Sequence, residues 1–129
     1  MEIWYKMLGV NLLIALLMLI SGKLFSARAP GNINNLFGYR TTMSMKNRDT
    51  WEFAHRFMGK QLWSWGWGCV AVVVAAMSLL RGRSEGLVQK VGIGLCIAMV
   101  AVYIVLAVRT ENALKEVFHE DGSRRESHE

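Results

Sequence analysis

The chain has 129 residues, of which 53% are hydrophobic and 19% are charged, and its formal net charge is +5. This length fits one domain, but the apolar residues are concentrated in three runs, at 7–25, 62–80 and 91–108. So short a chain has too few polar faces left to cover three such runs in water, which excludes a soluble helical protein.

Each run is long enough to cross a membrane. At about 1.5 Å rise per residue, 18 or 19 residues span roughly 27–29 Å, close to the hydrocarbon core of about 30 Å. The sequence therefore predicts an all-α integral membrane protein with three transmembrane helices. We expect residues 1–118 to form one domain, with a polar loop and an amphipathic helix at 26–61. Residues 119–129 are polar and are expected to be a disordered tail.

The first run contains a single strongly polar side chain in its first half, Asn11. We expect it to form a hydrogen bond to a neighbouring helix rather than to serve as a transport site. The small residues at 26–29 loosely resemble a signal-peptide cleavage site, but Pro30 would follow the cut directly. An uncleaved membrane anchor is therefore the expected role of this run.

The segment between the first two runs begins without periodicity and then becomes helical. Residues 26–46 contain several turn-forming residues, and a connection this long is uncommon unless it is functional or disordered. Helix is expected to resume near Asp49, because Asp49 and Glu52 have the spacing of a capping box; Asn47 is a second candidate cap. The amphipathic helix that follows either lies in the membrane interface or enters the second span directly.

The second and third runs contain no Asp, Glu, Lys, Arg or His. Ionisable residues within a bilayer usually mark proton or ion routes, so their absence argues against a proton-coupled transporter and against catalysis inside the membrane. Cys69 and Cys96 lie at different depths and are expected to be free thiols. Small residues at four-residue spacing are expected to let these two spans pack as a hairpin: Ala71 and Ala75, Gly94 and Ala98.

Positive charge indicates the orientation. Eleven of the 15 Lys and Arg residues lie in the first loop, its margins and the C-terminal tail. The positive-inside rule then places the loop and the C-terminus in the cytoplasm and the N-terminus outside. We expect a multi-pass protein of the bacterial cytoplasmic (inner) membrane.

The central loop contains the residues that could carry chemistry. Arg40, Arg56 and His55 could converge on an anion, and lipid headgroups are the nearest anions. His55 lies one helical turn from Trp51 on the less polar face, which favours a packed and hydrogen-bonded side chain over a catalytic one. No second His or Cys lies near enough to share a metal ion. We therefore predict no catalytic residue, no cofactor and no metal site.

The polar segment has the spacing N-x-x-x-G-x-R-T-x-x-S-x-x-N-x-x-x-W-x-x-x-H-R. Its signature residues are Asn34, Gly38, Arg40, Thr41, Ser44, Asn47, Trp51, His55 and Arg56. Between two apolar runs, this spacing resembles the signature of the SdpI family of bacterial membrane proteins. The family's namesake is an immunity protein against a secreted peptide toxin and also recruits a transcriptional repressor to the membrane. This chain has only the signature half of the longer namesake, and Thr42 stands where a proline often follows the Arg-Thr pair.

The resemblance implies a non-enzymatic membrane protein for immunity or resistance to a secreted membrane-active peptide toxin, or for associated signalling. Its expected partners are membrane lipids, a peptide toxin or a cytoplasmic regulator, and further copies of the chain in a homo-oligomer, with no direct contact to nucleic acid. The alternative is an anionic lipid-headgroup-binding protein or a membrane enzyme acting on a phosphate-bearing lipid through Arg40, His55 and Arg56. The sequence leaves open whether the loop is a binding site or a structural clamp.

Overall fold

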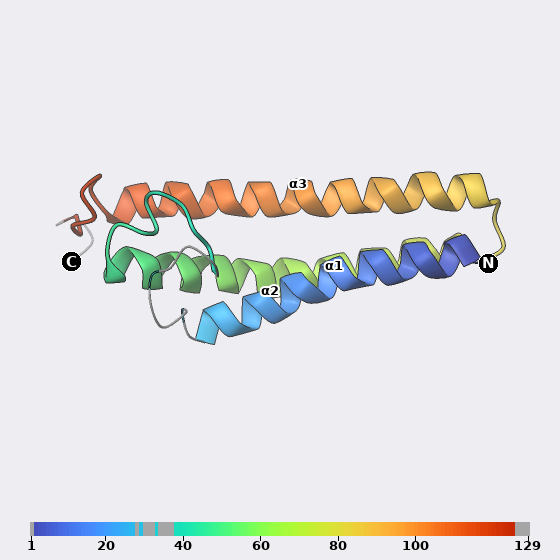
Figure 1. Ribbon diagram of the computed structural model, residues 1–129, viewed down its shortest axis with the longest axis horizontal. Coiled ribbons are helices and arrows are strands. Elements are labelled where there is room, and N and C mark those ends of the chain that lie inside the picture. Colours follow the sequence, from blue (N-terminus) through green and yellow to red (C-terminus); the bar gives the residue numbers. More distant parts are fainter. Residues whose placement is uncertain (1, 28, 30–32, 34–37, 126–129) are drawn as a thin grey trace.

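The computed structural model describes residues 2–27, 29, 33 and 38–125. It contains three α-helices, α1 (Glu2–Ala27), α2 (Arg48–Leu79) and α3 (Glu85–Val117), which lie side by side (Figure 1). All three are long and apolar enough to cross a membrane, and the described residues form no β-sheet. The predicted all-α fold with three transmembrane helices is therefore confirmed.

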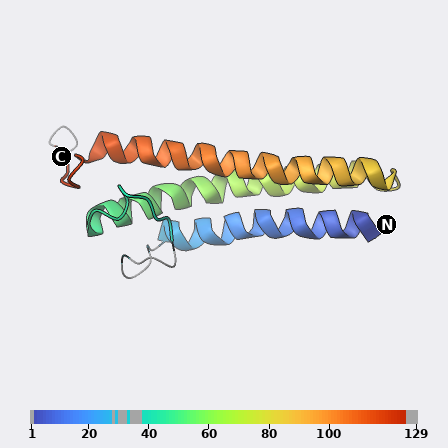
Figure 2. The same ribbon diagram turned by 45° about the horizontal axis from the view of Figure 1, so that its top comes forward.

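The bundle has two different ends. The N-terminus and the short connection from α2 to α3 lie at one end, which we call the hairpin end (Figure 1). The C-terminus, the start of α2 and the loop that precedes it lie at the other end, which we call the loop end; Figure 2 shows the same arrangement from a second direction. The described part of the segment with the predicted chemistry thus lies at one end of the bundle.

The helices extend beyond the predicted spans. α2 has 32 residues and α3 has 33, which at about 1.5 Å per residue is longer than the hydrocarbon core of about 30 Å. The predicted amphipathic helix is the first part of α2, so it enters the second span directly. This continuity gives the loop end a rigid helical support beyond the apolar part of the bundle.

The closest packing joins α1 to α2 through glycines. A Cβ atom added to Gly22 would lie 2.9 Å from the carbonyl oxygen of Gly59, and one added to Gly59 would lie 2.9 Å from that of Gly22. Further along, Gly66 packs directly under the Leu19 side chain. The expectation that other small residues join α2 to α3 was wrong, because these residues are all exposed: Ala71, Ala75, Gly94 and Ala98. Backbone contact is used between α1 and α2 instead.

Polar groups inside the apolar part of the bundle have partners on other helices. The Asn11 Nδ2 group donates to the carbonyl oxygens of Met7 at 2.9 Å and of Gly92, on α3, at 3.2 Å. The Cys96 thiol donates to Asn11 Oδ1 at 3.3 Å. The predicted interhelical hydrogen bond of Asn11 is therefore confirmed, and Cys69 and Cys96 are free thiols.

The outer faces of the helices are covered with large apolar side chains. Examples with at least half of their surface exposed are Leu13, Leu17, Ile20, Ile97 and Ile104. Contiguous apolar surfaces of this kind are rare on soluble monomers, whereas lipid tails cover them at no cost. The apolar surface and the helix lengths therefore both indicate a multi-pass membrane protein.

The C-terminal segment differs from the disordered tail expected from residue 119. Residues 118–125 form a turn, here called the C-terminal turn, in which the His119 N–H donates to the Ser123 carbonyl oxygen at 2.7 Å. Gly122 has φ of +93°, a conformation that favours glycine. Arg124 then pairs with Asp49 of α2 at 2.7 Å. Residues 126–129 lie outside the described part of the chain.

Candidate functional site

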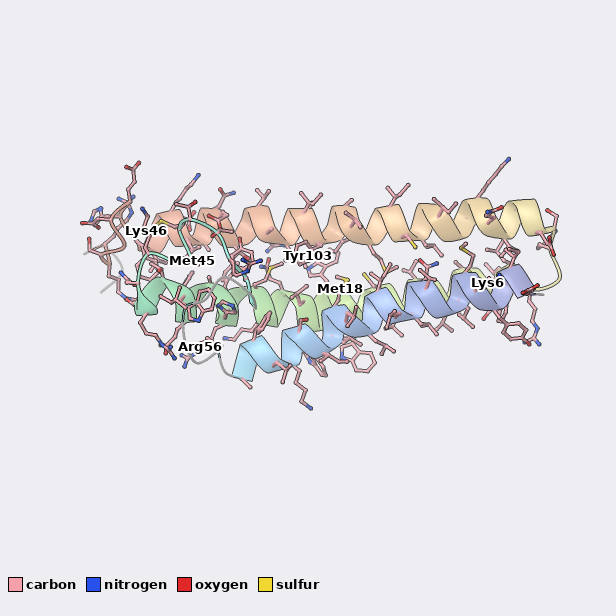
Figure 3. All side chains as sticks on the ribbon, in the orientation of Figure 1. Lys6, Met18, Met45, Lys46, Arg56 and Tyr103 are labelled. Carbon is pink, nitrogen blue, oxygen red and sulfur yellow. The ribbon has the colours of Figure 1, made fainter. Side chains whose placement is uncertain are left out.

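The candidate site is residues 38–47, here called the signature loop, together with the first turns of α2. The loop lies against α2 and reaches the loop end of α3, where Figure 3 labels Met45 and Lys46. Gly38 begins it with φ of 110°, a conformation that other residues rarely adopt. Of the signature residues, Asn34 lies outside the described residues.

Tyr39 ties the loop to both neighbouring helices. Its backbone N–H donates to Nε2 of His55 on α2 at 2.8 Å, and its hydroxyl donates to Oε1 of Glu111 on α3 at 2.7 Å. Burial and the Glu111 carboxylate raise the pKa of the Tyr39 hydroxyl, so it stays protonated and keeps its role as a donor. Sequence reasoning missed Tyr39, because an aromatic residue in a loop between membrane spans is expected to anchor at the interface.

His55 is completely buried, and both ring nitrogens are occupied. Nε2 accepts from Tyr39, and Nδ1 lies 2.8 Å from the Trp51 carbonyl oxygen. The neutral ring with its proton on Nδ1 satisfies both contacts at once. The rings of Trp51 and Phe25 pack against the imidazole with centroids at 4.2 and 4.9 Å. His55 therefore has no nitrogen left for a substrate or a metal ion in this conformation.

Thr41 and Ser44 form reciprocal hydrogen bonds in the middle of the signature loop. The Thr41 N–H donates to Ser44 Oγ at 2.8 Å, and the Ser44 N–H donates to Thr41 Oγ1 at 3.1 Å. The Ser44 hydroxyl is buried and lies 3.1 Å from the Tyr39 carbonyl oxygen. Since His55 is already engaged, it does not activate Ser44 as a nucleophile. Both hydroxyls shape the loop.

Asn47 is the N-cap of α2, and the capping box predicted from Asp49 and Glu52 was wrong. The Thr50 N–H donates to Asn47 Oδ1 at 2.9 Å, and the Asn47 N–H donates to Thr50 Oγ1 at 3.1 Å. Asp49 lies inside the helix and pairs with Arg124 instead. Asn47 Nδ2 also donates to the Gly122 carbonyl oxygen at 2.8 Å, so the cap holds the C-terminal turn.

Replacing Asn47 with alanine should lower the free energy of unfolding by about 1–2 kcal/mol, because the first turn of α2 loses its cap and the C-terminal turn loses an anchor. Asp49→Ala is the matched variant: it removes the exposed pair with Arg124, whose expected contribution is below about 1 kcal/mol. Thermal unfolding in detergent compares the two. A larger loss for Asp49→Ala would contradict the capping assignment.

The basic signature residues do not gather around His55. Arg40 and Arg56 are exposed, and Figure 3 shows Arg56 on the outer side of α2. Arg48 pairs with Glu52 at 3.0 Å. The arrangement of Arg40, His55 and Arg56 proposed for a lipid-headgroup site or a phosphate-directed enzyme is thus not supported, because His55 is enclosed by the loop's own groups.

A groove of about 410 Å³ lies between α1 and α3, next to the start of the signature loop. Figure 3 labels Met18 of α1 and Tyr103 of α3, which both line it. Gly38 and Tyr39 close its loop end. Its other lining residues are predominantly apolar and include Ile14, Leu17, Leu62, Met99 and Val100. No residue pattern in the sequence pointed to this groove, because the lining comes from separate helices.

Comparison with known proteins agrees with the signature. The model of the SdpI/YfhL protein family matches residues 31–110, more than half of the chain. The chain is also 31% identical to the Bacillus subtilis (strain 168) protein YfhL, itself described as uncharacterized, over 109 residues, which is 84% of this chain and 89% of the relative. No solved structure matches it significantly. The chain belongs to the SdpI/YfhL family of proteins.

Proposed function

We propose that this protein confers immunity or resistance to a secreted membrane-active peptide toxin, or takes part in signalling associated with it, without being an enzyme. The observation that carries the proposal is the closed signature loop. The side chains of His55, Ser44 and Thr41 form hydrogen bonds with backbone groups of the signature loop and of α2. A loop built in this way acts as a clamp that fixes the helix bundle rather than as a catalytic centre.

The proposal includes an orientation. The excess of Lys and Arg at the loop end supports placing this end in the cytoplasm of a bacterial cell and the protein in its inner membrane. The signature loop and the C-terminal turn would then be accessible to a cytoplasmic regulator, while the helices face the lipid in which a membrane-active peptide dissolves.

The groove between α1 and α3 is the proposed point of contact with the toxin. Its volume of about 410 Å³ lies within the range of about 300–1,000 Å³ typical of ligand pockets, and its lining is mainly apolar. A peptide that partitions into the bilayer presents apolar side chains, which match such a lining. Tyr39 closes the groove at the loop end. A peptide bound in the groove would therefore contact the signature loop directly.

Survival of toxin-sensitive bacteria tests the proposal. Cells that express this chain should survive a panel of secreted membrane-active peptides better than cells with an empty vector. Val100→Trp, at a position that lines the groove, should abolish that protection, whereas Ile97→Trp, at an exposed position of the same helix that does not line the groove, should preserve it. Equal sensitivity of expressing and empty-vector cells to every peptide, with the protein detected in the membrane, would refute the immunity role.

A further inference from the structure

A second cleft lies at the loop end and shares no lining residue with the groove. It has a volume of about 380 Å³ and is formed by three segments: the signature loop, the end of α3 and the C-terminal turn. Its lining residues are Thr42, Met43, Lys46, Lys115, Phe118, Glu120 and Arg125. None of them belongs to the signature residues, and none lines the groove proposed above for the toxin.

The charges in this cleft are unbalanced. Lys46, Lys115 and Arg125 line it together with a single carboxylate, that of Glu120. Among the described residues, the ion pairs of the chain join Lys6 to Glu2, Arg48 to Glu52 and Arg124 to Asp49, and none involves these three cations. The cleft therefore concentrates positive charge that the described part of the chain does not neutralise.

One of the cations is held in a fixed position. Nε of Arg125 donates to the carbonyl oxygens of Lys115 at 2.8 Å and of Phe118 at 3.1 Å. This anchoring leaves the terminal nitrogens of the guanidinium available as a fork of donors. Lys46 and Lys115, both exposed, line the same cleft.

We propose that this cleft binds a soluble anion that carries one or more phosphate groups. A guanidinium fork and two ammonium groups match the several oxygens of a phosphate. Charge-assisted hydrogen bonds of this kind are stronger than hydrogen bonds between neutral groups. The volume is within the range of small-ligand sites.

The depth of the cleft favours a soluble anion over a lipid. Lys115 lies six residues beyond Arg109, the first charged residue after the apolar run of α3, which at about 1.5 Å per residue is roughly 9 Å further along the helix. The headgroup layer extends only about 5–8 Å beyond the hydrocarbon core on each side. The cleft thus opens at or beyond the outer edge of that layer.

A bound phosphate would also connect three parts of the chain. Lys46 directly precedes Asn47, the N-cap of α2, and Arg125 follows Arg124, which pairs with Asp49. An anion held by both cations therefore favours the conformation in which the C-terminal turn is packed against α2 and α3. This coupling gives the binding event a measurable effect on stability.

Titration of the detergent-purified protein with inorganic pyrophosphate tests the proposal. Calorimetry should show saturable binding, and thermal stability should rise more than in sodium chloride of the same ionic strength. Lys46→Gln and Lys115→Gln should each weaken binding about tenfold, the loss of one charge-assisted contact. Lys90→Gln, an exposed lysine at the hairpin end, is the matched control and should bind like the unsubstituted protein. The proposal would be overturned if pyrophosphate raised thermal stability no more than sodium chloride. It would also be overturned if the Lys46→Gln/Lys115→Gln double variant bound pyrophosphate as well as the unsubstituted protein.

Native mass spectrometry distinguishes a soluble ligand from a lipid headgroup. The unsubstituted protein and the double variant, purified from the same membranes, should retain the same phospholipids. If an anionic lipid is retained only by the unsubstituted protein, and if adding that lipid prevents pyrophosphate binding, the site belongs to a lipid and the soluble-anion assignment is wrong.

Discussion

Alanine at Gly22 or Gly59 is expected to separate α1 from α2 and to lower the stability of the bundle more than most substitutions in the chain. A new Cβ atom at either position would meet backbone atoms of the opposite helix, at Trp63 N for Gly22 and at Ser26 N for Gly59. Backbone cannot rotate away as a flexible side chain can. We expect a loss at or above the upper end of the about 1–3 kcal/mol that overpacking usually costs.

Two other glycines provide matched controls on the same helices. A Cβ atom added to Gly9 of α1 or Gly68 of α2 would have nothing within 4 Å. Alanine there should leave stability unchanged or raise it by up to about 1 kcal/mol, because glycine is a weak helix former. Thermal unfolding in detergent, followed by circular dichroism, compares the four variants. If Gly22→Ala and Gly59→Ala unfold like the two controls, the close approach of α1 and α2 is refuted.

The sequence predicted the membrane spans but not which helix faces meet. Apolar runs of membrane length are a local property, so the three helices could be found without knowing their neighbours. Small residues at four-residue spacing occur on several faces, however, and Gly22 with Ser26 is only one such pair, so the spacing did not single out Gly22. Its partner is Gly59 on another helix, and such a pairing is visible only once the fold is known.

The start of α2 was ambiguous for a different reason. Asp49 and Asn47 are both good N-cap residues, and Glu52 has the spacing that usually completes a capping box with Asp49. The outcome was decided by Thr50, whose hydroxyl lies 3.1 Å from the Asn47 nitrogen and 3.1 Å from the Ser44 carbonyl oxygen. The second contact depends on the path of the loop, which no local pattern reveals.

The signature residues could be located by their spacing, whereas their partners could not. Tyr39 lies 16 residues before His55, and the hydrogen bond between them forms only because the loop runs back along α2. The choice between a binding site and a clamp depends on that contact, since the imidazole is either open to a ligand or enclosed. Spacing alone was compatible with both possibilities.

Replacement of His55 by alanine should open the signature loop. The Tyr39 N–H would lose its acceptor, which costs about 1–3 kcal/mol for a buried donor, and the space between Phe25 and Trp51 would become a cavity. Together these effects should exceed roughly 3 kcal/mol. Hydrogen exchange of the backbone amides at 38–47 should become faster, while the amides in the membrane-spanning part of α3 keep their protection.

His55→Phe and Arg56→Ala separate the possible causes. His55→Phe preserves an aromatic ring beside Trp51 but removes the acceptor, so it should cost only the hydrogen-bond part, about 1–3 kcal/mol. Arg56→Ala changes an exposed neighbour and should stay within about 0.5 kcal/mol of the unsubstituted protein, with normal exchange in the loop. If His55→Ala and Arg56→Ala both leave stability and exchange unchanged but both abolish protection against a toxin, these residues bind a partner and the clamp is not their role. The expected contrast between two adjacent residues therefore distinguishes the interior of the clamp from its exposed surface.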